Sequence, residues 1–191
     1  MLRAFLAIDL PGSLRAALAR YQENLKQSGA DVRWVPVGNI HLTLKFFGQL
    51  PESEVEPICQ AALGVAVGVP PLNLQVAGAG AFPNPRSPRV VWVGLAGDLE
   101  PLGVLYRRLE AAFASLGHLP EGRPFHPHLT LGRVRSPAGR ERLTRMLQEV
   151  DPPQCPGFRV GEMILFRSQL SPQGSTYTPL KVIPLGPGGG R

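Results

Sequence analysis

The chain has 191 residues, 43% of them hydrophobic and 18% charged, which suits one folded domain with a substantial core. No stretch approaches the roughly 18 consecutive apolar residues of a membrane span, and Asp9 and Pro11 interrupt the N-terminal AFLAIDL, so neither a membrane protein nor a secretory signal is expected. The formal net charge of +6 favours polyanionic partners such as nucleic acid, in a protein that we expect to be cytoplasmic.

The first half of the chain predicts two helices, three strands and a long hairpin. Apolar residues Leu14, Leu18 and Leu25 recur at helical spacing after Pro11, and Gly29 ends that helix. The predicted segments are strand 3–10, the helix between Pro11 and Gly29, strands 31–35 and 40–48, helix 51–67, and hairpin strands 72–82 and 90–97 around the Pro- and Arg-rich loop 83–89.

The second half repeats this order of elements. It comprises helix 99–117, the Pro-rich turn 119–127, strand 128–134, helix 138–150, and strands 158–170 and 175–185. The tail 186–191, GPGGGR, is expected to be disordered. Residues 1–185 are therefore predicted to form a single domain.

The tetrapeptide HLTL occurs twice, at His41 and at His128, in a chain with only four histidines. Each copy follows a helix and precedes another helix, so the two halves match in order as well as in motif. We interpret the chain as an internally duplicated α+β protein whose halves are related by a pseudo-twofold axis. This arrangement predicts that the two HLTL strands lie side by side where the halves meet.

Side chains alternate along a strand, so His41 and Thr43 should share one face, with Lys45 beside them, and His128 and Thr130 should share another. Two imidazoles, with pKa values near 6.5, can serve as an acid and a base at neutral pH. Threonine hydroxyls and the guanidinium of Arg133 can hold the oxygens of a phosphate. This set of groups predicts attack at phosphorus.

Two other interpretations of the motifs are open from the residues alone. A polar strand face can simply meet solvent. His126 and His128 form an HxH pair that could chelate zinc, although no carboxylate or cysteine follows at ligand spacing. Cys59 and Cys155 show no CxxC spacing and are expected to be reduced thiols, so no metal and no cofactor is predicted.

With both motifs in view, the sequence resembles the 2H phosphoesterase superfamily, and within it the RNA 2′,3′-cyclic phosphodiesterases, also called the 2′-5′ RNA ligase family. The paired family motif, His-x-Thr/Ser-x, matches residues 41–44 and 128–131. The flanking segments that agree are RAFLAIDL, HLTLKFFG, FPNPRSPRVVWVGL, FHPHLTLGR and LFRSQLSPQGSTYTPL, so the resemblance covers about residues 1–184.

The resemblance implies a bilobal α+β fold in which two antiparallel sheets face each other across a central cleft, with helices on the outside. It implies metal-independent opening of RNA 2′,3′-cyclic phosphate ends to 2′-phosphates, with 2′-5′ ligation as a related activity. His41 and His128 would be catalytic, with the first as the acid, and Thr43 and Thr130 would bind the phosphate. Arg133 matches a basic residue that often follows the second motif.

The expected partners are RNA with 2′,3′-cyclic phosphate ends, or cyclic nucleotides, bound by a monomer. An enzyme for a small cyclic nucleotide or an ADP-ribose cyclic phosphate is an alternative, and so is an RNA-end-binding module without turnover. Lys45 could hold the terminal nucleotide, and Phe47 is expected in the core. Trp34 and Trp92 are likewise expected in the core, and Arg86 and Arg89 could contact RNA or lie in a solvated loop.

Overall fold

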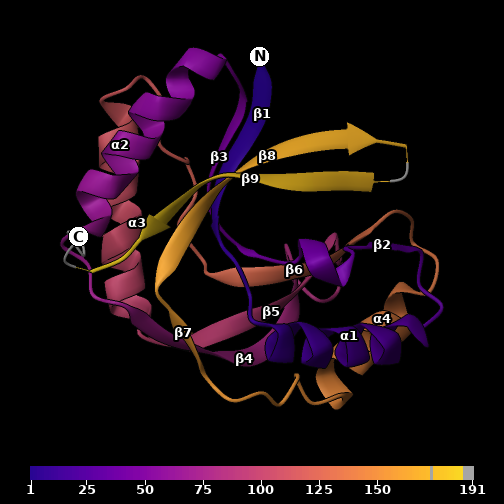
Figure 1. Cartoon of the computed structure of the whole chain (residues 1–191). Helices are drawn as coiled ribbons and strands as arrows, with labels where there is room; N and C mark the ends of the chain where they lie inside the picture. Colours follow the sequence, from indigo (N-terminus) through magenta and orange to yellow (C-terminus); the bar gives the residue numbers. More distant parts are fainter. Residues whose placement is uncertain (173, 187–191) are drawn as a thin grey trace.

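The computed structural model describes residues 1–172 and 174–186 (Figure 1). The helices are Gly12–Lys26 (α1), Val55–Ala66 (α2), Leu99–Ala114 (α3) and Arg140–Glu149 (α4), with short 3-10 turns Val37–Asn39 (η1) and Glu52–Glu54 (η2). The strands are Leu2–Ile8 (β1), Val32–Trp34 (β2), Leu42–Leu50 (β3), Leu72–Phe82 (β4), Val90–Gly97 (β5), His128–Val134 (β6), Phe158–Val160 (β7), Glu162–Ser171 (β8) and Gly174–Pro184 (β9).

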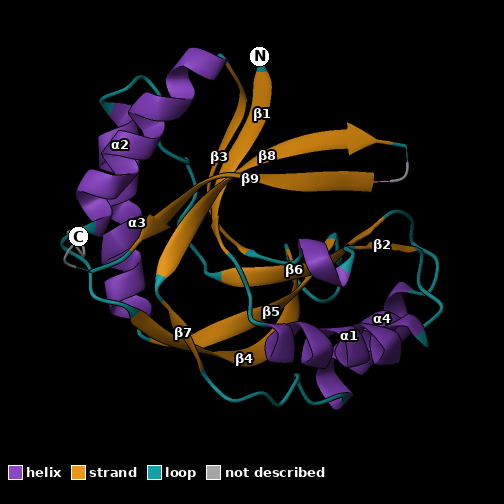
Figure 2. Cartoon of the chain, viewed as in Figure 1, coloured by secondary structure: helices purple, strands orange, loops and turns teal. Residues whose placement is uncertain are grey.

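The strands form two antiparallel sheets, one in the order β3-β1-β8-β9 and the other in the order β2-β6-β5-β4-β7. Helices α2 and α3 contact each other on one side of the molecule, and α1 and α4 contact each other on another (Figure 2). The predicted α+β class with two antiparallel sheets is confirmed. Each sheet takes strands from both ends of the chain, so the two halves of the sequence interleave.

The main core is one continuous cluster of buried apolar side chains from both sheets and all four helices. The leucines of both HLTL copies belong to it, since Leu42, Leu44, Leu129 and Leu131 are at most 3% exposed. Burying these leucines fixes which way the two strands face, because a slip of one residue would expose them. The histidines are thereby held on the opposite, open side.

The predicted strand 158–170 was wrong in one respect, because it is two strands that belong to different sheets. β7 pairs with β4, whereas β8 pairs with β1 and β9. Gly161 and Glu162 are exposed in succession, which breaks the alternation of buried and exposed positions where the chain crosses from one sheet to the other.

The tail predicted to be disordered lies outside the described residues, apart from Gly186. Within the described ranges, no helix combines the length and the apolar character that a bilayer crossing requires.

Candidate active site

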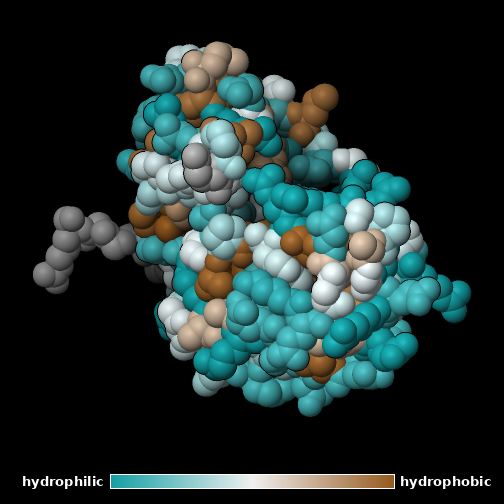
Figure 3. Space-filling model, turned by 90° about the vertical axis from the view of Figure 1, so that its right-hand side faces the viewer, coloured by the Kyte–Doolittle hydropathy of each residue, from teal (hydrophilic) through white to brown (hydrophobic). Residues whose placement is uncertain are grey.

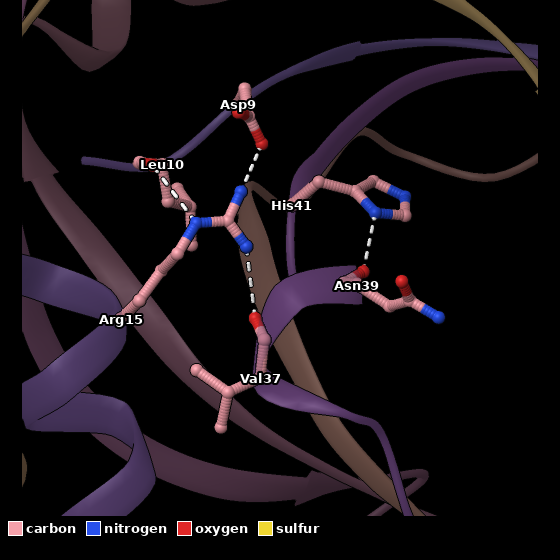
Figure 4. Close-up of polar contacts among 6 residues, drawn as sticks. All are labelled: Asp9, Leu10, Arg15, Val37, Asn39 and His41. Atoms are coloured by element: carbon pink, nitrogen blue, oxygen red, sulfur yellow. Dashed lines mark hydrogen bonds and ion pairs between the residues drawn. The ribbon is translucent and has the colours of Figure 1, made fainter. Parts of the chain in front are cut away.

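The two HLTL histidines are held in the same way. His41 Nδ1 lies 2.8 Å from the carbonyl oxygen of Asn39, and His128 Nδ1 lies 2.6 Å from that of His126, so each ring bonds the backbone two residues upstream. A carbonyl can only accept, so Nδ1 carries the proton in both rings. In the neutral imidazole, Nε2 then has a free lone pair, on the far side of the ring from Asn39 in the case of His41 (Figure 4).

The turn that carries the Asn39 carbonyl is held by a side chain of helix α1 (Figure 4). Arg15 forms an ion pair with Asp9, and its other guanidinium nitrogens donate to Leu10 O at 3.1 Å and to Val37 O at 2.9 Å. Val37 begins η1, the turn that ends at Asn39. The arginine therefore fixes the turn from which the His41 ring is oriented.

Aromatic rings surround His41 on the open side of the four-stranded sheet. Phe5 stacks on the imidazole with centroids 4.6 Å apart, and Tyr177 meets it edge-on at 5.5 Å. Burial lowers the pKa of His41, and the charge of Arg15 adds to this, while the Asn39 carbonyl and Asp9 act in the opposite direction.

His128 has a less enclosed environment. The ring of Phe82 meets it edge-on at 5.0 Å. Burial is again the main cause that lowers the pKa of His128, and the neighbouring charges of His126 and Arg133 lower it further, against the effect of the His126 carbonyl. In both rings the lowered pKa favours the neutral imidazole in the free protein, in which Nε2 is the unprotonated nitrogen.

Both HLTL strands carry a one-residue irregularity at the same place. In β3, Leu6 pairs with Lys45 and Ala7 with Thr43, which leaves Leu44 without a partner. In β6, Val91 pairs with Gly132 and Trp92 with Thr130, which leaves Leu131 without one. The second leucine of each motif is thus the extra residue of a β-bulge. Its repetition is structural evidence that the two motifs are equivalent.

The bulges decide which side chains join the histidines. Each bulge shifts the alternation by one position, so the residue three places after the threonine returns to the histidine side. In the second motif this residue is Arg133, which pairs with Val90 on the same face as Thr130 and His128. The expected position of Arg133 near the site is consistent with this register and with its charge acting on His128.

In the first motif the bulge brings Phe46 to the histidine side and turns Lys45 away. Phe46 is 51% exposed and lies 5.7 Å from the ring of Phe5. Lys45 is 4% exposed and forms an ion pair with Glu110 of α3 at 2.8 Å. The expectation that Lys45 contacts the terminal nucleotide is therefore wrong, because regular alternation does not continue past Leu44.

Thr43 and Thr130 are half-buried and lie on the same faces as the histidines. Among the described residues, neither hydroxyl takes part in a hydrogen bond with another protein group. Hydroxyls in that state are free to donate to an anion that enters between the two sheets. β3 and β6 contact each other across the sheets, so the two motifs are neighbours without being paired strands.

The remaining candidates divide between the core and the surface. Phe47 packs on Phe113 with centroids 5.0 Å apart, and Trp34 packs against the main core, both as expected. Trp92, which was also expected in the core, instead pairs with Thr130 on the histidine face. Arg86 and Arg89 are exposed in the loop between β4 and β5.

Sequence reasoning missed the residues that support the histidines, namely Phe5, Arg15, Asn39 and Tyr177. Arg15 and Asn39 act through backbone carbonyls, which no motif marks. Phe5 and Tyr177 come from strands at opposite ends of the chain. Phe5 does alternate with Ala7 on the first strand, which was a usable signal of a second buried face.

Within the described residues, the two motifs belong to no cluster of metal-ligating side chains. Across residues 1–172 and 174–186, no group of three or more His, Cys, Asp or Glu side chains is arranged to hold a metal ion. Two surface hollows, of about 220 and 370 Å³, are lined by other residues, among them Arg3 and Arg167 in the first and Asp9 and Arg159 in the second. Both histidines are half-buried, on two strands that contact each other across the sheets.

Known proteins are similar to this chain over nearly its whole length. The family model described as LigT like Phosphoesterase matches twice, at residues 8–92 and 93–177, which confirms the duplication. A protein named RNA 2′,3′-cyclic phosphodiesterase from Methanothermobacter thermautotrophicus is 40% identical over 96% of this chain and 98% of its own. A protein of the same name from Thermus thermophilus is 33% identical over 94% of this chain and 88% of its own.

Solved structures agree with these matches. The crystal structure of E. coli LigT in apo form has a TM-score of 0.79 and 31% identity, covering 97% of this chain and 98% of that one. The crystal structure of TT0787 of Thermus thermophilus has a TM-score of 0.78 and 30% identity, covering 96% and 98%. With two motifs, two matching bulges and a double family match, this chain belongs to the LigT-like phosphoesterase family.

Proposed function

We propose that the protein hydrolyses 2′,3′-cyclic phosphate ends of RNA to 2′-phosphates, with His41 and His128 as the general acid and base and with no metal ion. The observation that carries the proposal is the matched support of the two rings, each with Nδ1–H on a carbonyl and Nε2 free. Two such nitrogens on facing strands supply the two proton transfers that opening a cyclic phosphate requires.

The reaction follows from these positions. His128 Nε2 takes a proton from water, whose oxygen attacks the phosphorus atom. The bond from phosphorus to the ribose O3′ breaks, and protonated His41 gives its Nε2 proton to O3′. Thr43, Thr130 and Arg133 hold the non-bridging oxygens, where negative charge increases in the transition state. The products are a 2′-phosphate and a free 3′-hydroxyl, and each histidine has exchanged its protonation state.

The charges around the two rings favour this division of roles. Asp9 favours the protonated form of His41 and Arg15 opposes it, whereas both charges that act on His128, those of His126 and Arg133, favour the neutral form. A bound phosphate anion raises the pKa of both histidines, and His41 is the one with a further anionic neighbour. We therefore assign the role of the acid to His41, the ring with an anionic neighbour, and the role of the base to His128.

Relatives support the choice of substrate. The relatives named RNA 2′,3′-cyclic phosphodiesterase include the 40% identical protein from Methanothermobacter thermautotrophicus, and E. coli LigT has been crystallised with 3′-AMP. Attack by the 5′-hydroxyl of a second RNA in place of water would join the two chains through a 2′-5′ bond at the same site. The aromatic rings of Phe5, Phe46 and Tyr177 offer a surface on which a terminal base can stack.

The deciding experiment measures turnover of a nucleoside 2′,3′-cyclic phosphate in EDTA by wild type, His41→Ala and His128→Ala. Each variant should lose at least about 10³-fold in kcat, because each removes one of the two proton transfers. The product of the wild type should be the 2′-phosphate alone. His118→Ala is the matched control, since His118 lies against Phe47 and Glu54, away from both motifs, and it should retain activity.

Other outcomes separate the alternatives. Loss of turnover in EDTA, with recovery on adding a divalent metal, contradicts the metal-free mechanism. An inactive wild type that still binds RNA ending in a cyclic phosphate indicates an end-binding module. Faster turnover of an ADP-ribose cyclic phosphate than of any RNA end would identify a small-molecule enzyme. A cytoplasmic location and a monomeric state stay predictions.

A further inference from the structure

Two arginines face each other next to the second motif. Arg33 of β2 pairs directly with Arg133 of β6. Directly opposed residues of an antiparallel pair have their Cβ atoms only about 5 Å apart, so the two side chains leave the sheet together. β2 is an edge strand of the five-stranded sheet, so Arg33 lies one strand farther from the reacting groups than Arg133 does.

The register places both arginines on the histidine side of the sheet. Val32 and Trp34, the neighbours of Arg33, pack against the main core, so Arg33 points to the opposite face. Arg133 is on that same face because of the bulge at Leu131. The order across this face, from the reacting phosphate outward, is His128 and Thr130, then Arg133, then Arg33.

This pair of charges is unfavourable for the fold alone. Like charges directly opposite each other in a sheet destabilise it. Within the described residues, neither guanidinium takes part in an ion pair, and both side chains are exposed. An anion between the two guanidinium groups would relieve the repulsion, and the planar fork of arginine matches the oxygens of a phosphate.

The surroundings favour a phosphate that belongs to a chain. Arg89 is exposed at the adjoining end of β5, where its carbonyl accepts from Val134 N, the residue after Arg133. The side of the molecule that carries β2 and α4 is mainly hydrophilic over the lower half of the view in Figure 3. The three arginines therefore extend the cationic surface from the second motif toward the edge of the sheet.

We propose that Arg33, together with Arg133, binds the backbone phosphate next to the cyclic end, so that the enzyme prefers oligonucleotides to mononucleotides. This proposal rests on the proposed function and adds a second phosphate subsite to it. Arg133 has several N–H donors and also contacts the reacting phosphate, in every substrate, whereas Arg33 contacts only the neighbouring phosphate. A nucleoside cyclic phosphate has no such neighbour and cannot use Arg33.

The test compares two substrates with the same terminal nucleoside. One is the nucleoside 2′,3′-cyclic phosphate, and the other is a short single-stranded RNA ending in that nucleotide. For Arg33→Gln, kcat/KM should fall about tenfold on the RNA, as expected for one charge-assisted contact, and less than about twofold on the mononucleotide. On the RNA, log(kcat/KM) should fall less steeply with log salt for the variant than for wild type. The slope should be shallower by about 0.7, as for one lost phosphate contact.

Arg107→Gln is the matched control, because Arg107 is exposed on α3, on the other side of the molecule from β2 (Figure 1). This variant should leave kcat/KM unchanged on both substrates. An equal loss on both substrates for Arg33→Gln would assign Arg33 to the reacting phosphate and overturn the subsite, and so would no loss on either.

A binding measurement with the product RNA, which ends in a 2′-phosphate, tests the second phosphate subsite independently of the proposed function. If wild type turns over neither substrate, the proposed function fails. The ratio of RNA affinities of wild type and Arg33→Gln then decides the subsite by itself, with a tenfold ratio supporting it and a ratio near one overturning it.

Discussion

Gln22 and Leu131 lie 109 residues apart in the sequence, and Gln22 Nε2 donates to the Leu131 carbonyl at 2.8 Å. Leu131 is the extra residue of the bulge in the second motif, and Val35 N donates to the same carbonyl. The second amide hydrogen of Gln22 goes to Val35 O at 2.9 Å. One buried side chain of helix α1 thus holds the bulge that turns Arg133 toward the histidines.

Replacing Gln22 should therefore weaken both the fold and the site. Gln22→Leu leaves the carbonyl of Val35 without a partner in the core and should lower the free energy of unfolding by about 1–3 kcal/mol. Urea unfolding measures this loss, and kcat should fall as well because the bulge relaxes. Gln60→Leu, on the exposed side of α2, is the control and should change stability by less than about 0.5 kcal/mol. Equal effects of the two variants would contradict the role of Gln22.

Substituting the threonines tests whether their hydroxyls bind the phosphate oxygens without contributing to the stability of the fold. Thr43→Val and Thr130→Val keep the side-chain shape and remove only the hydroxyl. Each should lower kcat by about 10²-fold, as does the loss of one donor to a developing oxyanion, with unfolding unchanged within about 1 kcal/mol. Thr178→Val, at an exposed position of β9, should be as active as wild type. A change in KM alone would show that the hydroxyls bind substrate and transition state equally.

The pH dependence follows from the direction of the two pKa shifts. Burial lowers the pKa of both His41 and His128 below their ordinary value of about 6.5. The active form has one ring protonated and one neutral, so kcat/KM should peak below about pH 6.5 and decline above it. The pH optimum of kcat should be higher than that of kcat/KM, because the bound phosphate anion favours protonation of the histidines. A kcat/KM maximum at about pH 8 would contradict this account.

The buried ion pair of Lys45 and Glu110 connects the strand of the first motif to the loop that precedes the second motif. Lys45 Nζ also donates to Leu119 O at 2.7 Å, and Glu121 N donates to Glu110 Oε2 at 2.7 Å, which fixes the loop that leads to His128. Lys45→Met leaves a buried carboxylate unpaired and should cost about 3–5 kcal/mol of stability. The double variant Lys45→Met/Glu110→Leu should be more stable than Lys45→Met alone. Urea unfolding measures the stability of each variant. Losses that simply add in the double variant would rule out the pairing.

Gly94 allows a close approach of two strands beside His128. A Cβ atom at this position would lie 2.5 Å from the carbonyl oxygen of Ala77, where β4 is irregular. Gly94→Ala should therefore displace β4 from β5 and destabilise the protein by about 1–3 kcal/mol. At Gly64, within α2, no atom lies within 4 Å of the added Cβ, so Gly64→Ala should raise stability by about 0.5–1 kcal/mol. Thermal unfolding measures both effects, and Tm should fall for Gly94→Ala and rise for Gly64→Ala.

Much of the fold was predictable because the patterns that specify it are local. Helical spacing and turn residues gave α1, α2, α3 and α4 near their observed bounds, and the hairpin of β4 and β5 was predicted with its loop. The single predicted strand over 158–170 failed because nothing local to Gly161 distinguishes a bend within a sheet from a passage between sheets. Which strand becomes a neighbour depends on contacts that are distant in sequence.

The sequence by itself determined that two His-x-Thr motifs exist in equivalent settings, that their leucines are buried, and that the chemistry is directed at phosphate. These follow from residue type and from the period of a strand. Only the tertiary structure decided which side chains accompany the motifs. Bulges at Leu44 and Leu131 shift the period by one residue, so Arg133 joins the site and Lys45 leaves it. A bulge is stabilised by partners such as Gln22, far away in the chain, and strand periodicity cannot reveal it.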